Sequence, residues 1–444
     1  MKLKTFRGGV HPAGHKELSK SIPVEAYLPK GDLIFPTNQH IGKPARPVVK
    51  KGDKVLAGQL LAEADGFVSA NIICSCSGTV KAVEERHTIS GARATCVVVE
   101  NDGQFTPAPE VGKERHEGTF SNKDILEAIK SAGIVGLGGA GFPTHVKLTS
   151  KHPEAIDYII ANGSECEPYI TCDDALMQRE NRAIVEGLKL VLRLFPNAQG
   201  IIAIENNKPE AIQAMEAVCA GEKQVYVQQV LAKYPEGGER NLISVITGRD
   251  LKFGQLPADV GCIVCNVSTL YAIYRAVYYS EPLMERYFTV SGDAIVHPRT
   301  MSVRIGTSCG ELIDAAGGIK DGCTAKKVLC GGPMMGIAMS SLNVPISKNN
   351  NALTVLAEDP VEQAQAQVTA CIRCGRCAHV CPIHLVPQMM AEAAQHRDLK
   401  RYEHELYGLD CIACGSCTYV CPAKRPLMQL FKQTKAAIMA SKRK

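Results

Sequence analysis

The sequence predicts a multidomain protein that combines α/β and α+β units. The chain has 444 residues, and at about 150 residues per domain this length corresponds to about three domains. Hydrophobic residues make up 45% of the chain and charged residues 21%, fractions that exclude a disordered, collagen-like or coiled-coil protein. Short strands with glycine turns are followed by a helix, a glycine-rich loop and a cysteine-rich C-terminal region. The formal net charge of +5 is too small to indicate a nucleic-acid partner.

The 19 cysteines are the unusual feature of the composition. A secreted disulfide-rich protein would carry an apolar signal segment, but the first residues, MKLKTFRGGVHPAG, contain charge without one. We therefore expect reduced cysteines in a cytoplasmic protein. No run of about 18 or more predominantly apolar residues occurs, so no transmembrane segment is expected.

Eight of the cysteines form two copies of one pattern, offset by 40 residues. The spacing C-x2-C-x2-C-x3-C-P is that of bacterial ferredoxins, in which the fourth Cys of each run binds the other cluster. Zinc ribbons are the alternative, but they use paired CxxC knuckles without a fourth Cys followed by Pro. The pattern predicts a ferredoxin-like helical domain at residues 360–435 with two 4Fe-4S clusters. The expected ligands are Cys371, Cys374, Cys377 and Cys421 for the first cluster, and Cys411, Cys414, Cys417 and Cys381 for the second.

This C-terminal region is also basic. From residue 360 to residue 444 the chain has 12 Lys and Arg against 6 Asp and Glu, a balance of +6. Part of the excess lies in the final SKRK, which is consistent with a solvated tail. The alternative is a docking face for an acidic electron-transfer partner, because charge of one sign raises encounter rates.

A glycine-rich loop at residues 133–144 follows a predicted amphipathic helix over residues 124–132 that is entered from Ser121. Such a loop allows backbone N–H groups to approach a phosphate or an aromatic cofactor closely, and Lys147 adds a positive charge. Residues 157–161 predict a short apolar strand, which leads into the loop NGSECEP with its carboxylates Glu165 and Glu167. Polar groups at the carboxyl ends of strands are where open α/β sheets bind ligands.

Four strings, GLGGAGFPTHVK, ANGSECEPY, GGER (residues 237–240) and CNVSTL (residues 265–270), occur in this order. Together they resemble the flavin mononucleotide (FMN) and NADH site of the NADH-oxidising subunit of respiratory complex I. The resemblance implies a Rossmann-like α/β domain at residues 120–284. One departure is that GGER contains Glu239 but no second acid, which puts the nicotinamide-side contacts of that segment in doubt.

The resemblance also implies roles for individual residues. Glu167 and Glu239 are the candidate catalytic residues, and they face the dinucleotide together with Phe142. For Asn266 and Thr269, helix capping is an equally simple and compatible interpretation. The flavin phosphate and ring edge are expected at Gly136, Gly138, Gly139, Gly141 and Lys147, and hydrogen bonds to the flavin are expected from Asn162, Glu165, Asn266 and Thr269.

The N-terminal region has the GDxVxxGQ opening and short strands that resemble the barrel-sandwich hybrid of biotinyl and lipoyl carriers. The tip turn at residues 64–67 lacks the Lys that a carrier needs, so we expect residues 1–110 to form a structural sandwich. Residues 285–345, with the strand FTVSGDAI, resemble the small β-grasp domain that follows the flavin domain in the complex I subunit. Outside the clusters, Cys262 and Cys265 lie in the apolar stretch GCIVCNV and are expected to be buried strand residues.

This domain order, with the strings FRGGVHP, KYPEGGER, GQLPADVG and GGPMMG, is similar to the C subunit of the Rnf complex. The resemblance implies a peripheral subunit on the cytoplasmic face of the bacterial membrane, within a ferredoxin:NAD oxidoreductase. It would exchange hydride between NAD(H) and non-covalent FMN and single electrons with two 4Fe-4S clusters. Partner subunits, among them an iron–sulfur ferredoxin-like subunit, would move Na+ or H+. The alternatives are a cobalamin-reducing flavoprotein of bacterial microcompartments and a non-enzymatic docking subunit that keeps only the clusters.

Overall fold

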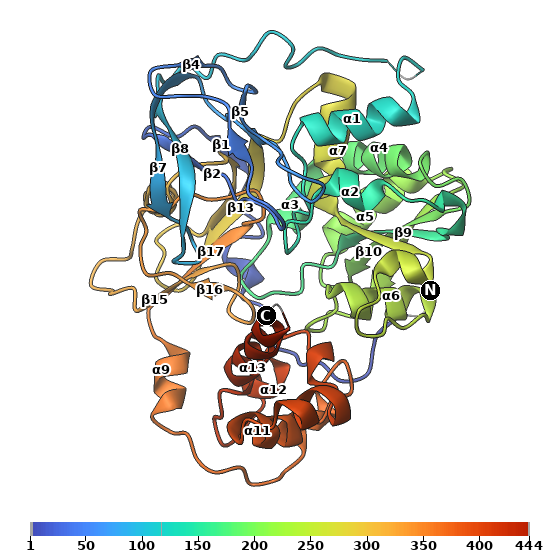
Figure 1. Cartoon of the computed structure of the whole chain (residues 1–444), viewed down its shortest axis with the longest axis vertical. Helices are drawn as coiled ribbons and strands as arrows, with labels where there is room; N and C mark the ends of the chain where they lie inside the picture. Colours follow the sequence, from blue (N-terminus) through green and yellow to red (C-terminus); the bar gives the residue numbers. More distant parts are fainter. Residues whose placement is uncertain (1–2, 117, 443–444) are drawn as a thin grey trace.

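The computed structural model describes residues 3–116 and 118–442. Figure 1 shows a β-sandwich beside a larger α/β domain, with a second sheet below the sandwich and a helical domain at the C-terminal end. Each of these parts has its own cluster of buried apolar residues. The described chain is therefore multidomain, as its length and composition predict.

The sandwich domain consists of two small sheets that face each other. Its core includes Leu33, Phe35, Leu61 and Val97, which come from strands of both sheets. One sheet has the order β2-β8-β7-β4, and the other has the order β3-β5-β6. The strands are β2 (Leu33–Pro36), β3 (Arg46–Pro47), β4 (Lys54–Val55), β5 (Leu60–Glu63), β6 (Ile72–Ile73), β7 (Gly78–His87) and β8 (Arg93–Asn101).

The central domain is built on a parallel sheet with the order β11-β10-β9-β12. Its strands are apolar runs, as expected for a sheet that helices cover on both faces, and Cys262 and Cys265 are buried in β12, as predicted. The strands are β9 (Tyr158–Gly163), β10 (Gln199–Glu205), β11 (Val225–Val230) and β12 (Cys262–Asn266). The helices are α1 (Asn122–Ser131), α2 (Thr144–Leu148), α3 (Cys172–Arg179), α4 (Asn181–Leu192), α5 (Pro209–Cys219), α6 (Glu239–Thr247) and α7 (Val267–Tyr279).

Local sequence explains how the elements around the glycine-rich loop begin. Helix α1 starts at the predicted place, because Ser121 and Asp124 form a capping box. In the parallel pairing of β9 with β12, Asn162 lies opposite Asn266. Both strands therefore deliver their polar ends to one edge of the sheet, beside the glycine-rich loop that joins α1 to α2.

The β-grasp domain is a six-stranded sheet with the order β1-β14-β13-β17-β15-β16. It extends beyond the expected residues 285–345, because β1 comes from the N-terminal segment and β17 follows residue 345. Helix α8 (Cys309–Ala315) packs on it through Leu312 and Ile313. The strands are β1 (Glu25–Tyr27), β13 (Glu285–Ser291), β14 (Arg299–Arg304), β15 (Lys327–Cys330), β16 (Ile337–Ala338) and β17 (Ala352–Leu356).

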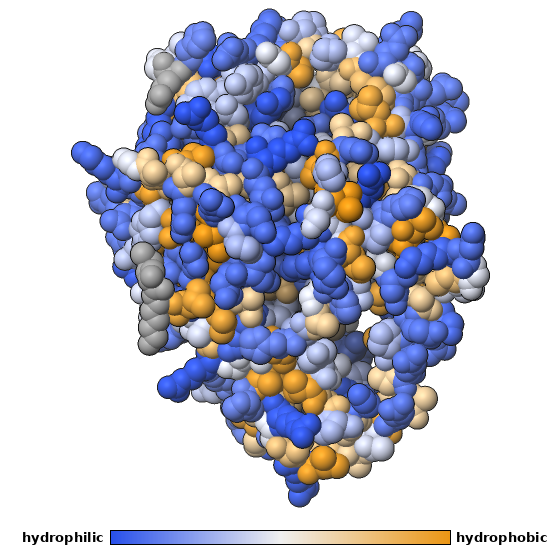
Figure 2. Space-filling view, turned by 180° about the vertical axis from the view of Figure 1, so that it is seen from behind, coloured by the Kyte–Doolittle hydropathy of each residue, from blue (hydrophilic) through white to orange (hydrophobic). Residues whose placement is uncertain are grey.

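The ferredoxin-like domain repeats its backbone along with its cysteines. Gly375 and Gly415 both have positive φ, 73° and 82°, and each precedes a short helix. The helices are α9 (Pro360–Gln365), α10 (Arg376–His379), α11 (Pro387–Gln395), α12 (Ser416–Tyr419) and α13 (Leu427–Ser441). No helix in the described residues is long and apolar enough to cross a membrane. Figure 2 shows a mostly hydrophilic face, on which apolar groups gather at several places, including the lower lobe that this domain forms.

Candidate functional site

The glycine-rich loop is closed on one side and open on the other. A Cβ at Gly138 would lie 2.8 Å from the Asn266 side chain, whereas a Cβ at Gly139 would meet nothing within 4 Å. Gly141 has φ of 71°, a conformation that favours glycine. Gly138 and Gly139 are exposed, and Gly136 is partly buried. The loop thus presents bare backbone to an open space, which fits a flavin phosphate or ring edge.

The start of α7 contacts the glycine-rich loop and holds it in place. Thr269 accepts a hydrogen bond from the Leu137 N–H at 3.0 Å. Asn266 caps α7, because its Oδ1 accepts from Ser268 N–H at 2.8 Å while its Nδ2 donates to Asp173 at 2.7 Å. Capping, the alternative interpretation, is confirmed for Asn266, whereas Thr269 positions the loop. A contact of either side chain with flavin stays a prediction.

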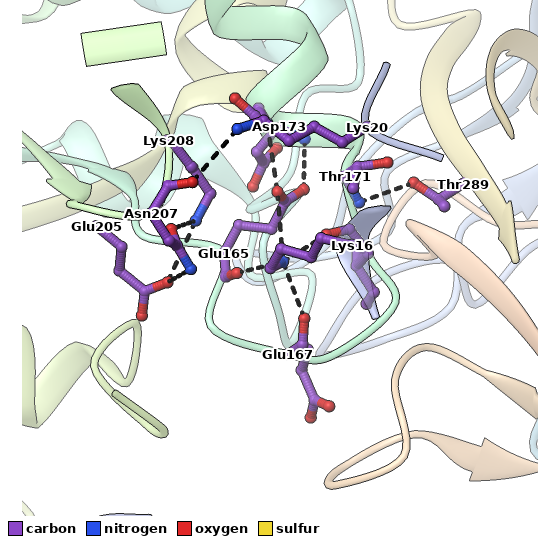
Figure 3. A network of polar contacts seen from close by, with 12 residues as sticks. Lys16, Lys20, Glu165, Glu167, Thr171, Asp173, Glu205, Asn207, Lys208 and Thr289 are labelled. Carbon is purple, nitrogen blue, oxygen red and sulfur yellow. Dashed lines mark hydrogen bonds and ion pairs between the residues drawn. The ribbon is translucent and has the colours of Figure 1, made fainter. Parts of the chain in front are cut away.

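The carboxylate loop after β9 is held in place by Lys16, which comes from the N-terminal segment and which the sequence patterns did not reveal. Its Nζ donates to the backbone carbonyls of Glu165 at 2.9 Å, Glu167 at 3.1 Å and Ile170 at 2.5 Å. Figure 3 shows Lys16 at the centre of this network, between Glu165 and Glu167. Three carbonyls of the loop thus converge on one ammonium group, while its two carboxylates are directed to different places.

The Glu165 carboxylate is directed into the protein. Its oxygens accept from the backbone N–H groups of Asp173 at 2.6 Å and Asp174 at 3.4 Å, at the start of α3. Lys16 lies 3.8 Å away, and the Glu165 side chain is 2% exposed. Burial raises the pKa of Glu165 to about 7. Its hydrogen-bonding capacity is therefore largely used by α3, and its predicted contact with flavin stays a prediction.

A second lysine holds the other end of the same loop. Lys208 is fully buried, donates to the Ser164 carbonyl at 2.6 Å and pairs with Glu205 at 3.2 Å. Nearby, Glu236 is fully buried, and neither of its carboxylate oxygens has a hydrogen-bond partner among the described residues. Burial, with a contribution from Glu205, raises the pKa of Glu236 to about 8. The region behind the loop is thus rich in buried titratable groups.

The Glu167 carboxylate is directed towards the β-grasp domain. Its two oxygens accept from the backbone N–H groups of Met334 at 3.1 Å and Met335 at 2.8 Å. A Cβ at Gly332 would collide with this carboxylate. Burial raises the pKa of Glu167 to about 7. Glu167 therefore joins the central domain to the loop GGPMMG (residues 331–336), and its predicted contact with the dinucleotide stays a prediction.

The open side of the site carries the remaining predicted residues. Lys147 donates to the Val264 carbonyl at 2.8 Å and to the Glu239 carboxylate at 3.2 Å. Glu239 is the first residue of α6, and its side chain is 43% exposed. Asn162 donates to the Gly237 carbonyl at 2.9 Å. Phe142, within the glycine-rich loop, is partly buried. The structure thus places Lys147 and Glu239, which are 92 residues apart, in contact.

The contact of Arg240 with the ferredoxin-like domain was not predicted, because the sequence showed only that an acid is missing at this position. Its guanidinium donates to the Asp410 carbonyl at 3.1 Å and to the Asp410 carboxylate at 3.1 Å. Asp410 directly precedes Cys411. The segment that carries Glu239 on the flavin side therefore also binds the ferredoxin-like domain.

The cysteines expected to bind the second cluster line one pocket together. Cys381 comes from the first run, whereas the other three come from the second, and the cross-over of ligands itself stays a prediction. Backbone N–H groups point at sulfur: Leu385 N–H at 3.3 Å from Cys381 and Ala413 N–H at 3.4 Å from Cys411. Burial and the neighbouring thiols raise the pKa of Cys411 to about 11. The pocket is lined by Cys381, Cys411, Cys414 and Cys417, with Pro382, Met390 and Phe431 among its apolar residues.

The cysteines expected to bind the first cluster lie nearer the surface. Cys371 and Cys374 are exposed. Burial raises the pKa of Cys377, with a smaller contribution from the nearby Cys421 thiol, which comes from the other run. Among the described residues, no three His, Cys, Asp or Glu side chains converge on a single metal ion. The thiols of the second set line one pocket, and the ligand sets of both clusters stay a prediction.

The second set of cysteines lies against the candidate flavin site. Tyr234 is buried, and its hydroxyl donates to the Cys414 carbonyl at 2.7 Å. Tyr234, Cys414, Met334 and Val10 form one buried cluster, against which Cys166 of the carboxylate loop packs. We call this cluster the junction. Through it the carboxylate loop, the GGPMMG loop and the second-cluster loop meet.

Comparison with protein families divides the chain as the structure does. The RnfC barrel sandwich hybrid domain matches residues 4–104, the Nuo51 FMN-binding domain residues 129–275, the SLBB domain residues 287–338 and the 4Fe-4S dicluster domain residues 367–425. The C subunit of the proton-translocating ferredoxin:NAD(+) oxidoreductase complex of Clostridium ljungdahlii is 44% identical over 98% of this chain and 94% of that protein. The chain belongs to this family of C subunits. The corresponding protein of the Na(+)-translocating complex of Acetobacterium woodii is 41% identical over 100% of this chain and 99% of that protein.

A solved structure with low sequence identity shows a similar fold. A chain of the NAD+-reducing [NiFe]-hydrogenase in the air-oxidized state superimposes with a TM-score of 0.52 at 20% identity, covering 73% of this chain and 67% of that one. The family assignment confirms the predicted domain types: a barrel-sandwich hybrid, an FMN-binding α/β domain, a β-grasp domain and a dicluster domain. As a member of this family, the chain is one component of a larger complex.

Proposed function

We propose that this chain exchanges hydride between NAD(H) and a non-covalently bound FMN and passes single electrons through two 4Fe-4S clusters. Nicotinamide transfers two electrons at once, whereas each cluster carries one, so a flavin is needed between them. The subunit would serve an ion-translocating ferredoxin:NAD oxidoreductase, whose other subunits couple the reaction to Na+ or H+ movement.

The junction is the observation that carries this proposal. The Tyr234 hydroxyl bonds the Cys414 carbonyl at 2.7 Å, so the second-cluster loop lies against the loops of the flavin site. Cys371 and Cys374 of the first run are exposed on the outside. Electrons would therefore pass from flavin to the second cluster, then to the first cluster, and then to a partner.

The residues of the open side would bind the two nucleotides. We assign the flavin phosphate to the loop from Gly136 to Gly141, with the charge of Lys147 beside it. Glu239 and Phe142 would face the dinucleotide. Glu167 has both oxygens occupied by the amides of Met334 and Met335, so its main role would be to hold the GGPMMG loop at the junction.

The surface around the first cluster suits an acidic partner. Ile372 is 65% exposed, and Arg373 and Arg376 are exposed beside Cys371 and Cys374. An apolar centre with a cationic rim favours a partner of negative charge. We propose that this partner is an iron–sulfur ferredoxin-like subunit of the complex, and that the chain binds peripherally at the cytoplasmic face of the membrane.

The experiment uses anaerobically reconstituted protein, which should hold about eight irons and eight sulfides. NADH is mixed with the wild type and with two variants that each remove one cross-over ligand. With Cys421→Ala, NADH should still reduce flavin and the second cluster. With Cys381→Ala, flavin should be reduced while the first cluster stays oxidised on the same time scale.

Three outcomes would contradict the proposal. Four irons or stoichiometric zinc would rule out two cubanes. Absence of flavin from purified protein would favour a docking protein that binds no nucleotide. If the first cluster of Cys381→Ala is reduced as fast as that of the wild type, the proposed order of electron transfer, from flavin to the second cluster and then to the first, is excluded.

A further inference from the structure

A buried lysine of the β-grasp domain binds a backbone carbonyl of the glycine-rich loop. Lys348 is 1% exposed, and its Nζ donates to the Gly133 carbonyl at 2.7 Å and to the Asn71 carbonyl. Asn71 belongs to the sandwich domain, so one ammonium group ties three domains together. Burial lowers the pKa of Lys348 to about 7.

A buried arginine lies beside it. Arg286 is 4% exposed, and its guanidinium donates to the Leu137 carbonyl at 3.1 Å and to the Lys348 carbonyl. Across the described residues, neither cation forms an ion pair with a carboxylate. Asp173 is the acid that acts on Arg286, but its own oxygens already bind the side chains of Asn266 and Ser268. Arg286 and the protonated form of Lys348 thus lack a direct counter-charge, which is costly unless an anion balances them.

The loop has further contacts from both neighbouring domains. Ile41 N–H of the sandwich domain donates to the Gly141 carbonyl at 3.1 Å. Asn349 Nδ2 of the β-grasp domain donates to the Gly139 carbonyl at 3.4 Å. The carbonyls of residues 133, 137, 139 and 141 are therefore all bound from outside the central domain.

The amides of the loop show the opposite pattern. Residues 137–140 form a turn, and in the part of the chain that the structure describes the backbone N–H groups of residues 138–142 donate no hydrogen bond of normal length and angle. Consecutive free N–H groups make an anion-binding concavity. A loop whose carbonyls are bound and whose amides are free is suited to a phosphate.

We infer that Lys348 and Arg286 are positioning residues for the flavin phosphate, which balances their charge while they hold the carbonyls of the glycine-rich loop away from it. The inference rests on the proposed function and extends it. It gives the sandwich and β-grasp domains a role, because both brace the loop. It also makes affinity for the phosphate, rather than for the isoalloxazine ring, the property that these two cations affect.

The test compares FMN with riboflavin, which lacks the phosphate. Apoprotein of the full chain is titrated with each flavin, and quenching of flavin fluorescence gives the two dissociation constants. Lys348→Met keeps the length of the side chain and removes its charge and hydrogen bonds. We expect the FMN dissociation constant to rise about tenfold or more, equivalent to about 1.4 kcal/mol, and the riboflavin constant to change less than about threefold.

Lys326→Met is the matched control. Lys326 is a cation of the same domain, and its side chain is 50% exposed in a pair with Glu358, so neither constant should change. An equal loss for both flavins in Lys348→Met would show a merely structural role, and an unchanged FMN constant would also overturn the inference.

A further variant keeps the inference testable if Lys348→Met does not fold. Asn349→Ala removes only the contact with the Gly139 carbonyl and should weaken FMN about twofold to fivefold more than riboflavin; equal effects on both flavins would again count against the inference. Failure of the wild type to bind either flavin would refute the proposed function itself. Wild-type binding of both flavins without selective loss in the variants would refute only the positioning role.

Discussion

The pair of Arg240 and Asp410 allows the docking of the ferredoxin-like domain to be measured. The two side chains are 22% and 18% exposed, and their N–O distance is 3.1 Å. Arg240→Met removes both of its bonds to Asp410, whereas Asp410→Asn removes only the charge and keeps the backbone carbonyl that Arg240 also binds. A double-mutant cycle with these two changes isolates the charged pair.

The burial of the pair sets the expected magnitude. Hydrogen bonds to charged groups contribute about 1.5–3 kcal/mol when buried, whereas exposed ion pairs contribute about 0.2–1 kcal/mol. Because this pair is mostly shielded from water but still reaches the surface, we expect a coupling free energy of about 1–2 kcal/mol.

The assay follows the loss of iron–sulfur absorbance during anaerobic urea unfolding of the wild type, the two single variants and the double variant. The pair Arg401 and Glu405 is the control, because its atoms are 3.9 Å apart and Glu405 is 72% exposed. Its coupling should stay below about 0.5 kcal/mol. If the effects of Arg240→Met and Asp410→Asn add within about 0.3 kcal/mol, the pair does not hold the domain and the reasoning fails.

Three further predictions concern the flavin side. Gly139→Leu should abolish FMN binding, because the new side chain would enter the open space beside the loop, while iron content stays the same; retained flavin would contradict the site. Glu167→Gln should keep flavin and leave the KM for NADH with an artificial acceptor within about threefold, yet slow reduction of the second cluster, because one amide of the GGPMMG loop would lose a charge-assisted bond. A KM raised tenfold would instead make Glu167 a dinucleotide contact. Burial raises the pKa of Glu236 to about 8, above about 4.3 for an unfolded glutamate. The folded state therefore binds the extra proton, so the free energy of unfolding falls as pH rises between these values. Glu236→Gln should make the urea midpoints at about pH 5.5 and 8 more nearly equal. An unchanged difference between the two midpoints would exclude Glu236 as the source of this pH dependence.

Features that depend on neighbouring residues could be predicted from the sequence. The repeat of the cysteine runs at 40 residues appears again in the backbone, since Gly375 and Gly415 take the same positive φ. The capping box at Ser121 gives the start of α1. In such cases the side chain and its partner lie within a few residues, so spacing alone contains the information.

Contacts between distant segments could not be predicted in this way. Lys16 binds carbonyls about 150 residues away, and Lys348 binds one 215 residues away. Neither lysine stands in a distinctive local pattern. Glu167 shows the same limit, because a carboxylate at the end of a strand has the same local sequence whether it binds a ligand or the amides of another loop.

The structure gives a physical reason for the missing second acid in the segment GGER. Relative to the complex I pattern, the sequence lacks a second acid after Glu239, and the structure places Arg240 there against Asp410. An acid at this position would face the Asp410 carboxylate in a partly buried site, where like charges repel and one of them would have to stay protonated. The arginine instead attracts Asp410 and so brings Cys411, the next residue, close to the flavin side. This departure therefore supplies an ion pair between the central domain and the ferredoxin-like domain, and the contact of Glu239 with a dinucleotide stays a prediction.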